Sequence, residues 1–156
     1  MTKAFAHLNL HTEYSLVDST VRIPSLMQRA AAANMPALAM TDRSNLFGLV
    51  KFFRQALAHG VKPLIGVDAR LFNSDEEERP FDLTLLCQNR DGYRNLTRLV
   101  SRSYIEGQRR GLAMLDPSWL DADSTRGLIA LSGAAGGDVG RAAAAGHADV
   151  AAERVR

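Results

Sequence analysis

The chain has 156 residues, an apolar content of 46% and a formal net charge of +2. This length and composition predict a globular domain with a hydrophobic core. No apolar run approaches the roughly 18 residues of a membrane-spanning helix, and the first residues lack the apolar segment of a signal peptide. We therefore expect a cytoplasmic protein with no membrane contact. The near-neutral charge neither requires nor excludes a nucleic-acid partner.

The single cysteine, Cys87, lies within the apolar run 83–87. One cysteine excludes a disulfide framework, and burial in an apolar segment favours an inert thiol. Thiol chemistry is therefore not expected.

Strand and helix patterns alternate from the start of the chain. An apolar alternation at Phe5, Leu8 and Leu10 predicts a first strand. Pro24 suits the first turn of a helix that ends at 34–36. The expected apolar face of this helix consists of Leu26, Met27, Ala30 and Ala31.

A short buried strand is predicted over 37–40, followed by a polar turn and a second helix. Ser44 or Asn45 is the expected N-cap of that helix, and Gly60 is expected to end it. Its apolar positions recur at helical spacing and are Leu46, Leu49, Val50, Phe53 and Leu57.

Three more strands are expected, one starting at 64–67 and the others over 83–87 and 128–131, with an exposed acidic loop over 73–80. The glycine-rich stretch 133–137 should lead into an alanine-rich helix. Another helix should run from about 90 to 104. It is expected to bury Tyr93, Leu96, Leu99, Val100 and Tyr104.

The same helix carries a row of arginines at i, i+4 spacing, Arg90, Arg94, Arg98 and Arg102. Such a row is either a solvated basic face or a contact for phosphates or an acidic partner. The only tryptophan, Trp119, is interpreted as a packed anchor rather than a base-stacking platform.

Alternating strands and helices with short connections favour an α/β fold with mainly parallel strands and flanking helices. Sites in such folds form at the C-terminal strand ends, where Asp18, Asp42 and Asp68 are expected to lie. Five strands do not close an eight-stranded barrel, and the pattern stops within a helix at Arg156. We therefore expect a chain truncated before a barrel closes; the alternative is a complete small open-sheet domain.

His11, Asp18, Asp42 and Asp68 offer the imidazole and carboxylate groups with which hydrolases bind several metal ions. Spacing alone does not decide this point. A histidine at a strand end can instead be a hydrogen-bonded structural residue, and an aspartate there can be a turn or helix cap.

Several segments resemble the N-terminal region of bacterial DNA polymerase III alpha subunits. They include HLNLHTEYSLVD at 7–18, MPALAMTDRSNLFGLVKF at 35–52, GVKPLIGVD at 60–68 and NRDGYRNL at 89–96, with glycine-containing segments at 127–133 and 137–140. That region is a PHP (polymerase and histidinol phosphatase) domain, a distorted β/α barrel. The resemblance implies that residues 1–156 are a partial PHP domain, the N-terminal part of the barrel, without the polymerase domains.

The resemblance also marks the positions of a metal site. Metal-binding PHP domains carry His-x-His in the first motif and Thr-Asp-His in the second. Here Asn9 replaces the first His, Arg43 replaces the His of the second motif, Asp68 replaces a Glu and Asp82 replaces another His. The resulting degenerate site comprises Asn9, His11, Asp18, Asp42, Arg43, Asp68 and Asp82.

An amide is a poor ligand for transition metals, and Arg43 carries a permanent positive charge. We therefore expect this segment to bind no metal or other cofactor and to contain no catalytic residue. A guanidinium among clustered carboxylates would replace the cation electrostatically.

The resemblance implies that the intact chain is a DNA-directed DNA polymerase that transfers nucleotides with Mg²⁺ held outside this segment. Its implied partners are the remaining polymerase domains of the same chain, a proofreading exonuclease subunit and, through the intact polymerase, DNA. The segment itself would act as a scaffold. The alternative is a metal-dependent PHP phosphoesterase or 3′–5′ exonuclease that uses the residual ligands.

Overall fold

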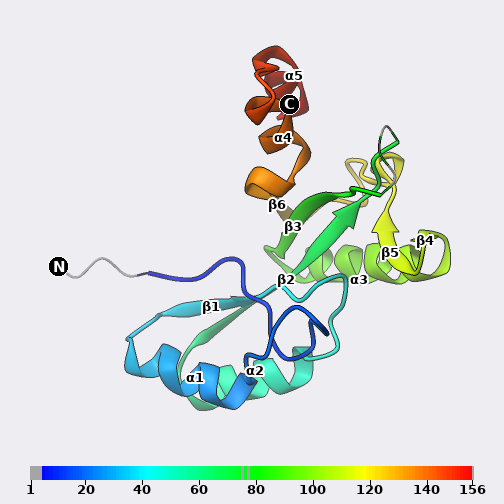
Figure 1. Cartoon of the computed structure of the whole chain (residues 1–156). Helices are drawn as coiled ribbons and strands as arrows, with labels where there is room; N and C mark the ends of the chain where they lie inside the picture. Colours follow the sequence, from blue (N-terminus) through cyan, green and yellow to red (C-terminus); the bar gives the residue numbers. More distant parts are fainter. Residues whose placement is uncertain (1–4, 75, 77, 156) are drawn as a thin grey trace. The chain divides into compact units, whose positions relative to one another are not determined.

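The computed structural model describes residues 5–74, 76 and 78–155. The chain divides into two compact units, Met1–Val67 and Asp68–Arg156, and strand β2 (Lys62–Leu71) continues across the boundary. Each unit combines helices with strands, which confirms the predicted α/β class (Figure 1). Among the described residues, no helix has the length and apolar character needed to cross a bilayer.

The first unit contains helix α1 (Ile23–Ala32), strand β1 (Ala37–Met40) and helix α2 (Leu49–Ala58). Strand β1 runs parallel to the beginning of β2, with Ala37 opposite Lys62 and Met40 opposite Ile65. A proline in the first turn of α1 and a positive φ of 53° at Asn34, just beyond its end, match the predicted limits of that helix.

The predicted strand at 5–10 is not regular. The carbonyl of His7 accepts from the N–H of Ala39 and the carbonyl of Leu10 from the N–H of Thr41, both at 2.9 Å. Three positions separate His7 from Leu10, whereas only two positions separate their partners Ala39 and Thr41. A regular ladder needs equal spacing on both strands, so the strand register is lost between these two hydrogen bonds. The segment therefore follows β1 without forming a full ladder.

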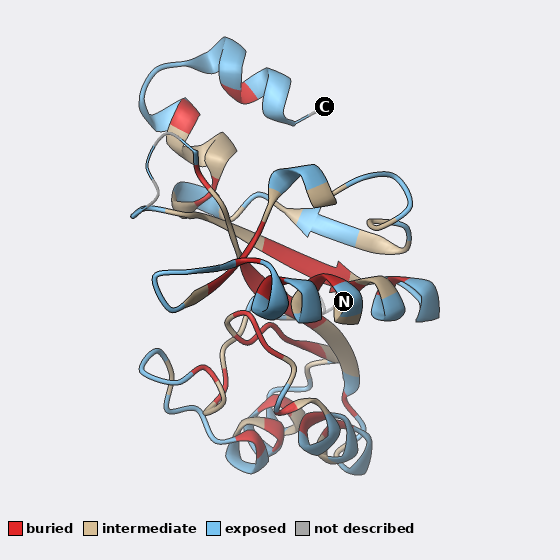
Figure 2. Ribbon diagram, turned by 90° about the vertical axis from the view of Figure 1, so that its right-hand side faces the viewer, coloured by how far each residue is buried: buried red, intermediate tan, exposed pale blue. Residues whose placement is uncertain are grey.

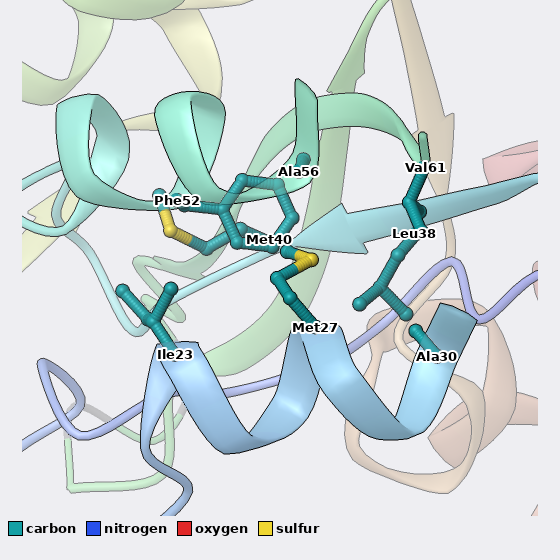
Figure 3. Close-up of a cluster of buried hydrophobic side chains, with 8 residues drawn as sticks. All are labelled: Ile23, Met27, Ala30, Leu38, Met40, Phe52, Ala56 and Val61. Atoms are coloured by element: carbon teal, nitrogen blue, oxygen red, sulfur yellow. The ribbon is translucent and has the colours of Figure 1, made fainter. Parts of the chain in front are cut away.

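The core of the first unit lies between α1, α2 and the parallel strands (Figure 3). Leu10 and Tyr14 pack against this core from the N-terminal segment. Burial of each large apolar side chain stabilises the unit by about 1.5–3 kcal/mol. The buried members of the core are Ile23, Met27, Ala30, Leu38, Met40, Phe52, Ala56 and Val61.

The start of α2 differs from the predicted one. Gly48 is the N-cap residue, not Ser44 or Asn45. Ser44 has a φ of 54°, and the side-chain oxygen of Asn45 accepts from the N–H of Phe47 at 3.0 Å. These polar residues form a turn that precedes the helix, because Asn and Ser side chains stabilise turns as readily as helix caps.

The buried face of α2 also differs. Phe52 and Ala56 are fully buried, whereas Val50, Phe53 and Leu57 are exposed. Because α2 is apolar on two faces, periodicity did not identify the face that packs on the core. The predicted helix end was correct, since Gly60 has a φ of 70° just after the helix.

The second unit contains a mixed sheet with the strand order β4-β5-β2-β3-β6. Strand β5 is parallel to β2, whereas β6 is antiparallel to β3 and β4 is antiparallel to β5. The sheet is thus less parallel than predicted. Its further strands are β3 (Phe81–Cys87), β4 (Gln108–Arg109), β5 (Leu112–Leu115) and β6 (Leu128–Leu131).

The hairpin of β4 and β5 was not predicted. Arg110 and Gly111 connect its strands with φ values of 51° and 78°. Two consecutive positive φ values are typical of the tight turn that joins twisted antiparallel strands. An arginine in this place is a weak turn signal, which explains why the sequence did not reveal it.

Helix α3 (Arg90–Ile105) packs against β3, β5 and β6. The side chain of Asn89 caps its start by accepting from the N–H of Gly92 at 3.0 Å. Leu96 and Leu99 are buried as predicted and Val100 is half-buried, but Tyr93 and Tyr104 are exposed at the edges of the buried face.

The predicted alanine-rich helix is divided. A short 3₁₀ turn, η2 (Ala134–Gly136), precedes α4 (Asp138–Ala144) and α5 (Ala148–Arg154), and Gly146 separates these helices with a φ of 82°. Most residues of α5 are exposed (Figure 2).

In the predicted acidic loop 73–80, residues 74, 76, 78 and 79 are exposed, Asn73 is buried, and residues 75 and 77 lie outside the described part of the chain.

Candidate functional site

The carboxylate of Asp42 is the buried centre of the site in the first unit. Asp42 follows the C-terminal end of β1 and is fully buried. Its Oδ1 accepts from the N–H of Thr12 at 2.6 Å and from Ser15 Oγ at 2.7 Å, and its Oδ2 accepts from Thr12 Oγ1 at 2.7 Å. Three short bonds offset the desolvation of this buried polar group and attach the strand end to the loop 11–18.

A second carboxylate, Asp18, lies at the more exposed side of the site. Its Oδ2 is paired with Nδ1 of His11, and Nε of Arg43 lies 4.0 Å from the same oxygen. The His11 side chain is 16% exposed and that of Asp18 is 42% exposed. Asp18 is thus placed between an imidazole and a guanidinium, and solvent reaches it.

Arg43 is held by its backbone as well. Its N–H donates to Ser15 Oγ at 2.9 Å, and its carbonyl accepts from the side-chain amide of Asn45 at 3.0 Å. Because Ser15 Oγ also donates to Asp42, this hydroxyl links the two neighbouring residues of the second motif. The backbone of Arg43 is therefore held by the same loop that surrounds the buried carboxylate.

The loop 11–18 is itself tightly folded. The N–H of Ser15 donates to the carbonyl of Thr12 at 2.9 Å, and Ser19 Oγ donates to the carbonyl of His11 at 2.8 Å. Val17 has a φ of 69°, a rare conformation for a β-branched residue. This closure brings His11 and Asp18 together despite their separation in sequence.

An ion pair attaches the same loop to α2. Lys51 Nζ donates to Glu13 Oε1 at 2.8 Å and lies 5.6 Å from the centre of the Tyr14 ring. This hydrogen bond lowers the pKa of Glu13 and raises that of Lys51. Because Lys51 is exposed, solvent screening leaves the pair only a small effect on stability.

The remaining residues of the predicted site have different settings. Asn9 is exposed, in the irregular segment beside β1. Asp68 is buried inside β2 rather than after its end, and its Oδ1 accepts from Thr84 Oγ1 on β3 at 3.2 Å. Asp68 therefore bonds across the sheet of the second unit.

Asp82, on β3, faces the glycine-rich turn of the second unit. A Cβ at Gly136 would lie 2.3 Å from Asp82 Oδ2, and one at Gly133 would lie 2.1 Å from the Asp82 carbonyl oxygen. Glycine is needed at position 133, where the contact is with backbone and φ is 69°; a side chain at position 136 would instead displace the Asp82 carboxylate. Four residues of the predicted site thus lie together in the first unit, His11, Asp18, Asp42 and Arg43. Asp68 and Asp82 belong to the second unit.

The donor groups of the first unit do not suit a divalent cation. Both oxygens of Asp42 already accept protein hydrogen bonds, and a cation near Asp18 would lie beside a permanent positive charge. Within the described residues, no group of three or more His, Cys, Asp or Glu has an arrangement that could hold a metal ion. Arg43 is the permanent positive charge that the structure places beside Asp18.

Sequence reasoning did not find the hydroxyl groups of the site. Thr12 and Ser15 are buried and bind Asp42, and Thr84 is buried and binds Asp68. The available signal was a Thr and a Ser close to His11 in a short polar loop. Such residues are usually interpreted as turn formers, so nothing in their spacing singled them out.

Comparison with known proteins places these observations in a family. The PHP domain family matches residues 7–156. The DNA polymerase III subunit alpha of Pseudomonas aeruginosa is 46% identical over 142 residues, which are 91% of this chain and 12% of that protein. The same subunit of Escherichia coli is 40% identical over 151 residues, 97% of this chain and 13% of that protein.

A third relative, the DNA polymerase III subunit alpha of Pseudomonas fluorescens, is 45% identical over 147 residues and is covered to 12% of its length. The chain thus spans only a small part of these relatives. An amidohydrolase structure from Chromobacterium violaceum has a TM-score of 0.49 over 63% of this chain and 32% of that one, at 20% identity. Because the family match extends from residue 7 to residue 156, the chain belongs to the PHP domain family.

Proposed function

We propose that the chain is the N-terminal part of the PHP region of a replicative DNA polymerase III alpha subunit, where it acts as a metal-free scaffold. Relatives that carry this subunit name are 40–46% identical over 91–97% of the chain, which supports the assignment. The observation that carries the metal-free part is the approach of Arg43 to Asp18 at 4.0 Å. A guanidinium there supplies positive charge that a bound cation would otherwise supply.

In this role the residues of the site stabilise the fold. Asp42 ties the end of β1 to the loop 11–18 through Thr12 and Ser15, and Arg43 balances negative charge at the surface of the same loop. The nucleotidyl transfer of the intact polymerase, with its Mg²⁺ ions, belongs to domains outside this segment. The cytoplasm is the expected compartment, and DNA is reached through the intact chain.

The partners that this proposal requires are the remaining polymerase domains and a proofreading exonuclease subunit. An exposed apolar row on and before α2 supports a docking role for the first unit: Phe47 is 70% exposed, Val50 63% and Leu57 59%. Exposed large apolar side chains that gather on one surface are typical of protein interfaces. The row lies on the side of α2 that does not carry the buried Phe52 and Ala56.

A binding experiment tests the scaffold role. The chain, alone and within the intact polymerase, is mixed with the purified proofreading exonuclease subunit of the same organism, and complex formation is followed by calorimetry. We expect binding that Val50→Asp combined with Leu57→Asp weakens at least about tenfold, whereas Ser101→Asp on the exposed side of α3 has no effect. Absence of a complex with either form of the chain would contradict the scaffold role.

An activity assay tests the alternative of a PHP hydrolase. Purified chain is incubated with Mn²⁺ or Zn²⁺ and either bis(p-nitrophenyl) phosphate or single-stranded DNA labelled at its 5′ end. We expect no hydrolysis above a metal-free control, since the ligand positions lack three imidazoles, at Asn9, Arg43 and Asp82. Metal-dependent hydrolysis that Asp42→Asn abolishes would establish the hydrolase and overturn the proposal.

A further inference from the structure

A cavity of about 280 Å³ lies between α3 and the segment that joins β5 to β6 in the second unit. Its lining includes Arg98, Leu99 and Arg102 of α3, Trp119 at the end of the 3₁₀ turn η1 (Pro117–Trp119), and Asp121 and Asp123 of the loop after it. None of these residues belongs to the degenerate metal site. The cavity therefore requires an explanation of its own.

One wall of the cavity is formed by a stacked pair. The guanidinium carbon of Arg102 lies 4.1 Å from the centre of the Trp119 ring, and Arg102 Nε donates to Glu106 Oε2 at 2.7 Å. Ser124 Oγ donates to the carbonyl of Trp119 at 2.7 Å. Stacking and hydrogen bonding thus fix this wall before any ligand arrives.

The acidic residues of the cavity are engaged by their own loop. Asp121 Oδ1 accepts from the N–H of Asp123 at 2.9 Å and from the N–H of Ser124 at 2.7 Å. Asp123 pairs with Arg126. Their negative charge is therefore partly compensated and does not require the arginines of α3.

The loop is also attached to α3. The side-chain amide of Asn95 donates to the carbonyls of Asp123 and Arg126 at 2.9 and 3.0 Å. Both sides of the cavity are thereby held at a fixed spacing.

Arg98 is the basic group of the cavity that is left for a ligand. Its neighbours on the helix are occupied, Arg94 with Asp91 at 3.5 Å and Arg102 with Glu106 at 2.7 Å. Within the described part of the chain, no carboxylate lies within ion-pair distance of Arg98, which is exposed. A guanidinium fork in this state binds a carboxylate through two parallel hydrogen bonds.

We propose that this cavity binds an acidic peptide segment of a partner protein, with a Glu or Asp carboxylate on Arg98 and an adjoining apolar side chain against Trp119. The volume of about 280 Å³, just below the range of about 300–1,000 Å³ for small-molecule sites, suits one or two side chains. The indole ring and Leu99 supply the apolar part of the surface. The site depends neither on the metal-free centre nor on the polymerase assignment.

The same observations disfavour single-stranded nucleic acid as the ligand. A phosphate chain needs several uncompensated cations, and this lining contains two aspartates beside its two arginines. A single carboxylate needs only one such cation, which Arg98 supplies.

Trp119 is the only tryptophan of the chain, so its fluorescence reports on this cavity alone. The probe is the capped peptide acetyl-Leu-Glu-Glu-Leu-amide, titrated into the 156-residue chain. We expect a saturable change in emission with a Kd on the order of 1 mM, because a short flexible peptide makes few contacts and loses conformational entropy when it binds. The matched peptide acetyl-Leu-Gln-Gln-Leu-amide should bind at least about tenfold more weakly, because it lacks the charge.

Two variants locate the contact. Arg98→Gln should weaken binding at least about tenfold, and the control Arg94→Gln, one turn away and outside the cavity, should bind like the original chain. Circular dichroism checks that each variant is folded; if Arg98→Gln is not, Arg98→Lys, which keeps the charge but loses the fork, should still weaken binding measurably.

Several results would overturn the proposal. They are no change in emission with the acidic peptide, equal affinity for the Glu and Gln peptides, or equal affinity of the Arg98 and Arg94 variants. A response to an oligothymidylate of eight nucleotides without a response to the acidic peptide would assign the cavity to nucleic acid instead.

Discussion

Thr12 and Asp42 are joined by two hydrogen bonds, since the N–H and the hydroxyl of Thr12 donate to the two oxygens of the buried carboxylate at 2.6 and 2.7 Å. The pair connects the loop after the first, irregular segment to the end of β1. Both residues are fully buried. The buried carboxyl group is stable in this setting because both its oxygens accept hydrogen bonds from protein donors.

Asp42→Asn should destabilise the protein by about 2–4 kcal/mol. The new NH₂ group would replace one of the two oxygens that now accept hydrogen bonds from Thr12 and Ser15, and so would face donors in a buried site. Urea denaturation followed by circular dichroism measures the change. The control Asp91→Asn removes a carboxylate that is 67% exposed and should change stability by no more than about 0.5 kcal/mol. Equal stability of the two variants would contradict the structural role of Asp42.

Burial raises the pKa of the Cys87 thiol from its ordinary 9.0 to about 11. Because the thiolate is the reactive form, alkylation by iodoacetamide at pH 8 should be about 100-fold slower in the folded chain than in the chain unfolded in guanidinium chloride. Mass spectrometry of samples taken over time gives both rates. Similar rates in the two states would show that Cys87 is accessible and ionised.

Asp121 should make stability depend on pH in the acid range. Hydrogen bonds from Ser124 lower the pKa of its carboxyl. The folded state therefore holds this proton less tightly than the unfolded state, so the stabilisation is present above the unfolded-state pKa near 4 and is lost as pH falls through the lower folded-state pKa.

Thermal unfolding between pH 3 and pH 6 tests this dependence. Asp121→Asn keeps a side-chain acceptor but cannot titrate, so the loss of Tm on acidification should be smaller in this variant than in the original chain. Parallel Tm curves for the two proteins would mean that the Asp121 carboxylate does not stabilise the loop.

The regular elements were predictable where one local signal dominated. The limits of α1 and the end of α2 followed from Pro24, Asn34 and Gly60, whose backbone preferences need no tertiary context. The predicted start of α2 was wrong, because the Asn45 side chain stabilises a turn before the helix instead of capping it. The predicted buried face was wrong, because the side with Phe52 packs on the core and the side with Val50 is exposed. In these places, tertiary packing decides between local alternatives of similar free energy.

The site was predictable in part for a different reason. Residues that follow a strand end, such as Asp42, are placed by topology, and the proximity of Arg43 to Asp18 follows from the motif. The roles of Thr12 and Ser15 depend on how the loop 11–18 folds back, which includes a positive φ at Val17. A sequence pattern does not encode that closure.

Restoring the missing ligands should create metal affinity. The variant with Asn9→His, Arg43→His, Asp68→Glu and Asp82→His returns a coordinating group at each altered position. In a version lengthened to the whole family domain, calorimetry should detect Mn²⁺ or Zn²⁺ binding that the original sequence lacks. The control variant Asn9→Gln with Arg43→Gln removes the positive charge without adding an imidazole, and should gain much less.

If the restored variant folds, as judged by circular dichroism, and still binds no more metal than the original, these positions do not form one site. Equal gains in the restored and control variants would instead mean that removal of the Arg43 charge alone permits binding.

Elemental analysis of the purified protein, prepared without chelators and in both the 156-residue and the lengthened form, tests the metal-free centre most directly. Because Arg43 lies beside Asp18 and protein donors bind both oxygens of Asp42, we expect no stoichiometric zinc, manganese or iron in either form. At least one tightly held ion per chain, lost together with the Asp42 carboxylate in Asp42→Asn, would contradict the account.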